Sequence, residues 1–263
     1  MQDKKGLIFM KYAIHAGHGV KGKGTVGAVG FLDESVETRE IVSRVKRYLE
    51  TDGHTVVDCT EDSGTANQIL ASIVKKTNDS KADISISIHF NAGAKKTSDG
   101  KTTGVEVFVY SPASSLIPVA RRITEKVTLL GFKNRGVKFN SSLYVLRRSN
   151  MPSMLIECCF VDDPDDAKLY NRDEMAKAIA EGILNKKLDI LDPSLAPKPN
   201  QLGEFRVRVT STSLNVRNKP STLGKIVTSV KQKEVYTIID MNGNWGKLKS
   251  GAGWINLKHT ERI

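Results

Sequence analysis

Two histidines occupy positions from which they could bind a metal ion. His18 lies between two glycines, directly after the strand-like segment KYAIHA at 11–16. The glycines allow a sharp bend and leave the imidazole unobstructed beyond the strand end. His89 belongs to the segment DISISIHF at 83–90, whose alternation places this histidine on the polar face of a strand. For His18 taken alone, a solvated side chain in a glycine-rich turn is the alternative interpretation.

A carboxylate interrupts an apolar segment further along the chain. Glu157 lies in the middle of MLIECCF at 154–160. Burying a lone carboxylate costs several kcal/mol, so we expect Glu157 to face a cation, a partner or a cleft. The alternative is that Glu157 ends the buried segment and pairs with Arg147 or Arg148.

The elements that must position these side chains alternate along the chain. Strands are predicted at 11–16, 54–59, 83–90, 104–110, 143–146 and 153–160, and helices at 34–50, 65–75, 115–130 and 173–188. This alternation predicts an α/β fold with a mostly parallel twisted sheet that carries helices on both faces. Reactive groups in such sheets collect just past the carboxyl ends of the strands.

The composition changes near residue 189. Prolines and glycine interrupt both periodicities at 189–203, which predicts a linker. Residues 204–263 contain five short β-rich runs, FRVRVT, KIVTSV, VYTIID, WGKLK and GWINL, separated by turns. Strands this short predict a small all-β barrel. The expected domains are therefore 10–188 and 204–263.

The charge of the chain concentrates in its last quarter. The net charge is +11, and residues 201–263 contribute 11 Lys+Arg against 4 Asp+Glu, a net of +7. This segment should attract a polyanion such as nucleic acid, an anionic membrane or the teichoic acids of a cell wall. The sequence contains no recognition-helix, RNP or zinc-finger pattern, which argues against nucleic acid.

Cysteine usage and hydropathy exclude several classes of protein. Cys59, Cys158 and Cys159 suit neither a disulfide framework nor a CxxC zinc site, so we expect buried reduced thiols. Apolar runs are too short for a membrane span or a secretory signal, which predicts synthesis and retention in a cytoplasm unless a signal has been removed. Met10 is a candidate for the natural start, with 1–9 as an upstream extension.

Four motifs follow one another in the first 188 residues. They are HAGHG at 15–19, Glu34 at the start of the next helix, SIHFNA at 87–92, and the segment from GVKFN to DPDD at 136–166. In order and spacing they resemble the zinc-dependent N-acetylmuramoyl-L-alanine amidases of the amidase-3 type. The resemblance spans 10–188 and looks closest to the amidase domains of endolysins from phages of clostridia and related bacteria.

This resemblance implies roles for individual residues. His18, Glu34 and His89 match the zinc ligands of the family, and Glu157 matches its catalytic glutamate. Two imidazoles and one carboxylate leave a fourth tetrahedral position for water, as in catalytic zinc sites. Glu157 would then act as general base and general acid in hydrolysis of the amide between N-acetylmuramic acid and L-alanine of the stem peptide.

Two further positions are marked by the same comparison. Asn91 matches an asparagine of the family, and this match implies a role in substrate binding or in organisation of the site. His15 departs from the family, since many members have an acidic residue there. Three interpretations are open for His15. It could support a metal ligand, it could compete as a ligand, or it could have no metal role, which is the outcome we expect.

The C-terminal segment resembles bacterial SH3-like wall-binding modules through SLNVRNKPSTLGKIV and GNWGKLKSGAGWINL. Trp245, Tyr236 and Trp254 are candidates for stacking on wall sugars or peptides, although some of them are expected to serve the core. Binding to an anionic wall would be sensitive to salt.

The whole chain is therefore expected to be a peptidoglycan hydrolase with Zn²⁺ as cofactor. The favoured interpretation is a phage endolysin without a signal peptide, which stays in the host cytoplasm until release through a membrane pore and then acts at the cell wall. Expected partners are peptidoglycan and anionic wall polymers, with no nucleic acid and no membrane insertion. The alternatives are an exported or sporulation-associated autolysin of the same chemistry, and a non-catalytic wall-binding protein.

Overall fold

The structure is a computed structural model that describes residues 9–94, 97–189, 205–220, 224–242 and 245–263. The chain divides into two compact units, residues 1–191 and 192–263. The expected linker at 189–203, apart from its first residue, lies outside the described residues, as do residues 1–8 of the suggested N-terminal extension.

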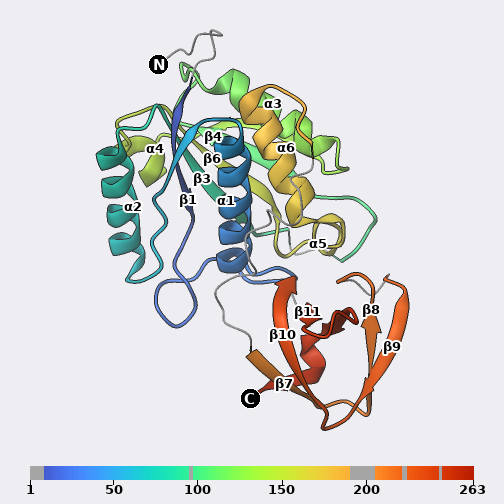
Figure 1. Cartoon of the computed structure of the whole chain (residues 1–263). Coiled ribbons are helices and arrows are strands. Elements are labelled where there is room, and N and C mark those ends of the chain that lie inside the picture. The colour runs from blue at the N-terminus through green and yellow to red at the C-terminus, as the bar shows by residue number, and fades with distance from the viewer. Residues whose placement is uncertain (1–8, 95–96, 190–204, 221–223, 243–244) are drawn as a thin grey trace. The chain divides into compact units, whose positions relative to one another are not determined.

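The first unit is built on a six-stranded sheet with the order β2-β1-β3-β6-β4-β5 (Figure 1). All neighbours run parallel except β4 and β6, which are antiparallel. The mostly parallel sheet predicted from the sequence is thus confirmed. The strands are β1 (Lys11–Ala16), β2 (Thr55–Asp58), β3 (Ile84–Asn91), β4 (Val105–Val109), β5 (Asn134–Phe139) and β6 (Ser153–Phe160).

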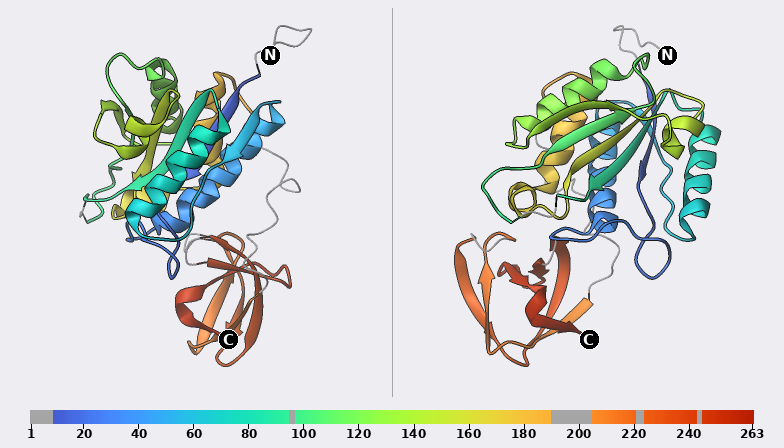
Figure 2. Two further views of the ribbon diagram at one scale, coloured as in Figure 1. Left: turned by 90° about the vertical axis from the view of Figure 1, so that its left-hand side faces the viewer. Right: turned by 180° about the vertical axis from the view of Figure 1, so that it is seen from behind.

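Helices cover both faces of this sheet, as Figures 1 and 2 show. One face carries α1 (Glu34–Thr51), α3 (Ile117–Thr128) and α6 (Arg172–Leu184), and the other carries α2 (Ala66–Ser80) and α4 (Tyr144–Arg148). The short helix α5 (Pro164–Leu169) follows β6. Successive strand residues point to opposite faces, so Leu155 packs with α2 and α4 while Ile156 packs in the larger core.

Three elements of the first unit, α4, β5 and α5, differ from the sequence prediction. The predicted strand at 143–146 is instead the helix α4, whose Val145 and Leu146 pack against α2. An apolar run of four residues suits either state, and here one helical turn is enough to bury it. Strand β5 was not predicted, because it lies at the sheet edge, has no buried residue and lacks an apolar alternation. Helix α5 was not predicted either, because its six residues, PDDAKL, show no apolar periodicity.

The second unit is an antiparallel sheet of seven strands that curls around its own core, in the order β13-β7-β10-β11-β12-β8-β9 (Figure 1). The five predicted runs all form strands. The structure adds β8, within the SLNVR segment, and the short C-terminal β13. The strands are β7 (Phe205–Val209), β8 (Ser213–Arg217), β9 (Ile226–Lys231), β10 (Val235–Asn242), β11 (Trp245–Leu248), β12 (Trp254–Asn256) and β13 (Thr260–Arg262).

Within the residues that the structure describes, no helix is both long enough and apolar enough to span a membrane.

A buried ion pair connects α1 and α6. Arg172 donates from Nε and Nη2 to the two carboxylate oxygens of Glu37, each at 2.7 Å, and the Tyr170 hydroxyl donates to the same carboxylate at 3.0 Å. The side chains of Arg172 and Glu37 are only 4% and 2% exposed. The guanidinium therefore compensates a carboxylate that water hardly reaches.

Replacement of Arg172 should reveal this dependence. Arg172→Met leaves Glu37 buried without its cation, which should lower the free energy of unfolding by about 3–5 kcal/mol. Urea denaturation followed by circular dichroism measures the change.

The matched control is Lys75→Met on α2, which breaks the exposed Lys75–Asp79 pair. Its effect should stay below about 1 kcal/mol. Equal effects of the two substitutions would contradict the structural role given to Arg172.

Candidate metal centre

The candidate site lies where three neighbouring strands end. Strands β1, β3 and β6 are adjacent and parallel, so their carboxyl ends meet at one edge of the sheet. His18 follows the end of β1, and His89 lies near the end of β3. Glu157 lies in β6, directly beside His89 in register.

The turn around His18 depends on close packing and on an uncommon backbone conformation. Gly17 donates its N–H to the Ile88 carbonyl at 2.9 Å, and a Cβ at this position would lie 2.1 Å from Cε1 of His89. Only glycine therefore allows the turn after β1 to pass the His89 ring. His18 itself has φ = +59°, the left-handed region that few non-glycine residues adopt. The Arg39 guanidinium donates to the His18 carbonyl at 2.9 Å and holds the turn.

Glu34 connects this turn with the end of β3. It is the first residue of α1, and the side chain of the N-cap residue Asp33 accepts a hydrogen bond from the Ser35 N–H. Oε2 of Glu34 accepts from the Ala28 N–H at 2.8 Å, and Oε1 accepts from the Phe90 N–H at 3.1 Å. A backbone N–H therefore holds each oxygen of the carboxylate. The side chain is only 3% exposed.

The three side chains converge on one point. Oε1 of Glu34 lies 3.1 Å from Nδ1 of His89 and 3.5 Å from Nε2 of His18. One ligand atom from each residue lies within 4.8 Å of the other two. Two ligands bound tetrahedrally to one ion at 2.0–2.2 Å lie roughly 3.3 Å apart, so the two distances from Glu34 to the histidines match those of ligands that share a metal ion.

The pKa shifts of the cluster differ from one side chain to the next. For His89, burial lowers the pKa, but its hydrogen bond with Glu34 and the charges of Glu157 and Glu34 raise it overall, so a metal ion would have to displace a proton there. Burial lowers the pKa of His18 and outweighs the attraction of the Glu34 charge. Burial opposes ionisation of Glu34, yet its hydrogen bond with His89 and the charges of both histidines lower its pKa overall. The carboxylate is therefore ionised, which is the form that binds a metal.

Glu157 lies near the same carboxyl ends of the strands, but its surroundings differ from those of Glu34. The pKa of Glu157 is raised to about 7, because burial together with the Glu34 and Glu106 charges outweighs the opposing effect of His89. Its Oε2 atom is buried and has no hydrogen-bond partner among the described residues. A carboxyl group of this kind can accept and donate a proton near neutral pH.

Glu106 is a second buried carboxylate at the site, and sequence reasoning missed it. It lies in β4 opposite Glu157 and is 4% exposed. Its two oxygens accept from Nδ2 of Asn91 and from Nε of Arg135, each at 2.8 Å. The signal was available, because Glu106 interrupts the apolar segment GVEVFV just as Glu157 interrupts MLIECCF.

His15 lies apart from the cluster of possible ligands. It is 1% exposed, and its Nδ1 atom lies 3.4 Å from the Ser87 hydroxyl of the adjacent strand. Burial, together with the nearby His89, lowers the pKa of His15 to about 3. The side chain is therefore a neutral imidazole inside the sheet.

Comparison with known families gives two matches. A family described as N-acetylmuramoyl-L-alanine amidase matches residues 13–186, and a bacterial SH3 domain matches residues 212–260. The amidase match lies within the first compact unit, and the SH3 match lies within the second.

Individual relatives agree with these families. An endolysin of Bacillus phage SPP1 is 31% identical over 260 residues, which cover 90% of this chain and 92% of the endolysin. An uncharacterized protein of Clostridium perfringens is 32% identical over 86% of this chain and 67% of its own length. Among solved structures, the catalytic domain of the CD27L endolysin targeting Clostridia difficile is 29% identical, with a TM-score of 0.61, and covers 68% of this chain and 99% of that domain.

The backbone at His18 leads to a stability prediction. His18→Gly and His18→Ala both remove the imidazole, but only glycine adopts φ = +59° without strain. The Gly variant should therefore be the more stable of the two by about 1 kcal/mol. Urea denaturation with a chelator present measures this difference without any contribution from metal.

The same pair of substitutions at Lys75, an exposed position within α2, serves as the control. There the order should reverse, with Gly less stable than Ala by about 1 kcal/mol. If His18→Ala proved at least as stable as His18→Gly, the turn would not have the conformation described.

Proposed function

The chain belongs to the N-acetylmuramoyl-L-alanine amidase family, and from this premise we propose that it is a zinc-dependent phage endolysin. In this proposal Zn²⁺ is held by His18, Glu34 and His89. The bond cleaved is the amide between N-acetylmuramic acid and the L-alanine of the stem peptide. The observation that carries the proposal is the convergence of these three side chains, which are far apart in the sequence.

The donor set supports zinc as the metal. Two imidazole nitrogens and one carboxylate oxygen are a common protein contribution to catalytic zinc sites, which keep one position open. A zinc ion there supplies Lewis acidity, which promotes attack by water near neutral pH and polarises the scissile carbonyl. The hydrogen bonds from the Ala28 and Phe90 N–H groups hold the Glu34 carboxylate in a fixed orientation.

Glu157 is the proposed general base and general acid. It would take a proton from the attacking water and deliver it to the nitrogen of the departing L-alanine. Its unpartnered oxygen and its pKa of about 7 support this role. The carboxylate lies beside His89 in register, so proton transfer would occur next to the ligand cluster.

Asn91 is proposed to contact the substrate and to organise the site. Its amide nitrogen donates one hydrogen to Glu106, which leaves the second for a ligand. Arg135 pairs with the other oxygen of Glu106, so the charge beside Glu157 is partly compensated. This network would hold Asn91 and Glu106 in place beside Glu157.

The second unit is proposed to hold the enzyme on the wall. Its match to bacterial SH3 domains and its net charge of +7 support binding to an anionic polymer such as peptidoglycan. The similarity to the phage endolysin further supports a protein that is released through a membrane pore and then acts on the wall.

Replacement of Glu157 tests the mechanism. Glu157→Gln keeps the shape of the side chain but removes its capacity to take a proton, so hydrolysis should fall by roughly a hundredfold or more. Bound zinc should remain at one ion per chain. Digestion of purified peptidoglycan, with mass spectrometry of the products, measures the rate and identifies the bond cleaved.

A chelator added to the unsubstituted chain is the accompanying control, and it should stop the release of free L-alanine amino groups. Full activity of Glu157→Gln would remove Glu157 from the mechanism. Cleavage of a glycosidic bond, or activity that a chelator leaves unchanged, would contradict the proposed reaction.

Removal of the second unit tests the anchoring role. Deletion of residues 204–263 should reduce sedimentation with cell walls several-fold, while hydrolysis of soluble muramyl peptides stays within about twofold of the full chain. Circular dichroism confirms that the shortened chain is folded. Undiminished sedimentation would contradict anchoring by this unit.

A further inference from the structure

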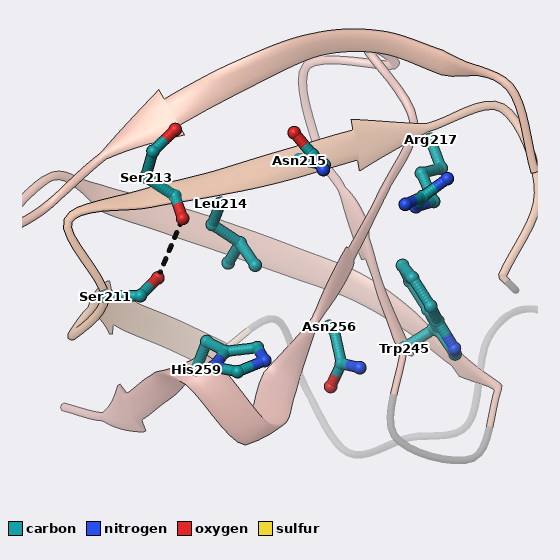
Figure 3. Close-up of a pocket in the computed structure, with 8 residues that line it drawn as sticks. All are labelled: Ser211, Ser213, Leu214, Asn215, Arg217, Trp245, Asn256 and His259. Atoms are coloured by element: carbon teal, nitrogen blue, oxygen red, sulfur yellow. Dashed lines mark hydrogen bonds between the residues drawn. The ribbon is translucent and has the colours of Figure 1, made fainter. Parts of the chain in front are cut away.

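The second unit contains a pocket, lined mostly by polar residue types, whose ligand the proposed anchoring role does not specify. It has a volume of about 240 Å³ and lies between β8, β11 and the segment that follows β12 (Figure 3). Sites for drug-sized molecules measure roughly 300–1,000 Å³, so this pocket suits a short piece of a polymer. The side chains that matter for its chemistry are Asn215, Arg217, Trp245, Asn256 and His259.

Trp245 is the aromatic side chain that this pocket exposes. The ring of Trp254 faces Lys247, whose ammonium nitrogen lies 5.9 Å from the ring centre. Tyr236 packs on the core and donates its hydroxyl hydrogen to Glu234. Trp245 belongs neither to the core cluster nor to the hydrophobic residues packed against it. Figure 3 shows its ring at one end of the pocket, near Arg217.

Arg217 gives the pocket a positive charge in a fixed place. Its Nη1 donates to the Gly224 carbonyl at 2.7 Å, which orients the guanidinium. None of the described residues that line the pocket is acidic. An anchored guanidinium without a neighbouring carboxylate in its pocket is suited to a carboxylate ligand, which it can bind through two parallel hydrogen bonds.

The asparagines supply peptide-like groups along the same pocket. Oδ1 of Asn256 accepts from the Lys258 N–H at 3.0 Å, which fixes the side chain and leaves its amide nitrogen as a donor. Figure 3 places Asn256 between Trp245 and His259, and Asn215 on the opposite strand. An amide side chain can donate to and accept from a peptide group.

We propose that this pocket binds the free carboxylate end of a short wall peptide, with the carboxylate on Arg217 and an adjoining peptide plane against Trp245. This inference rests on the proposed function, since it names the ligand of the anchoring unit. A neutral sugar would stack on the indole but would not use the charge. A polyol phosphate would use the charge but offers no flat group to the indole.

The two tryptophans of the chain allow a direct test, because both lie in this unit. In full-length Trp254→Phe protein, Trp245 is the sole tryptophan and its fluorescence reports on the pocket. The probe is a synthetic stem tetrapeptide with a free C-terminal carboxylate, which lacks the muramyl amide and is not hydrolysed. We expect saturable quenching, and at least tenfold weaker binding of the same peptide with a C-terminal amide.

Substitution then assigns the contact. Arg217→Ala should weaken binding of the carboxylate peptide by roughly tenfold to a hundredfold, because a hydrogen-bonded charge is lost. Arg217→Ala should leave the weaker binding of the amidated peptide nearly unchanged. The matched control is Arg208→Ala, which removes the same charge from the exposed pair with Glu261 outside the pocket and should change affinity less than twofold.

Several results would overturn the proposal. These are equal binding of the two peptides, equal effects of the two arginine substitutions, or saturable binding of chitotriose or a glycerol phosphate oligomer in place of the peptide. Hydrolysis of soluble muramyl peptides is measured on the same preparations. Failure of that reaction would count against the proposed amidase activity, whereas failure of peptide binding alone would count against the pocket.

Discussion

The Glu34 carboxylate is the group on which the arrangement of the candidate centre depends. One of its oxygens faces both imidazoles and accepts a backbone hydrogen bond from the end of β3, while the other is held by the loop before α1. Loop, helix and strand are thereby joined at one side chain. An ionised carboxylate buried this deeply requires positive charge or donors around it, and the site supplies two N–H groups and two histidines. A divalent cation would complete this compensation.

The other carboxylates at the same edge show how environment separates similar groups. Glu106 has both oxygens bonded, to Asn91 and Arg135, whereas Glu157 in the adjacent strand keeps an oxygen without a partner among the described residues. The paired carboxylate is suited to a structural role. The unpaired one, with a pKa raised by burial to about 7, is suited to moving a proton. Strand pairing places Glu106 and Glu157 side by side, so one part of the sheet is suited to both the structural role and the proton transfer.

Much of this arrangement could be predicted from the sequence, because the motifs mark strand ends and a helix start. The glycines around His18 and the alternation before His89 identify positions that a parallel sheet brings to a single edge. Short segments were harder to assign. The run at 143–146 is a helical turn because its apolar side chains pack against α2, a tertiary contact that no local pattern encodes. Glu106 could have been identified, because its neighbours are as apolar as those of Glu157. Its partner Arg135 could not, because Arg135 lies on an edge strand whose sequence has no periodic pattern.

The central claim is that three side chains, distant in the sequence, bind one metal ion. Anomalous diffraction at the zinc absorption edge, from crystals of the full chain grown with zinc, tests it most directly. We predict one peak, about 2.0–2.2 Å from a nitrogen of His18, an oxygen of Glu34 and a nitrogen of His89. A zinc peak at another position, or active protein whose three side chains hold no ion, would contradict the account.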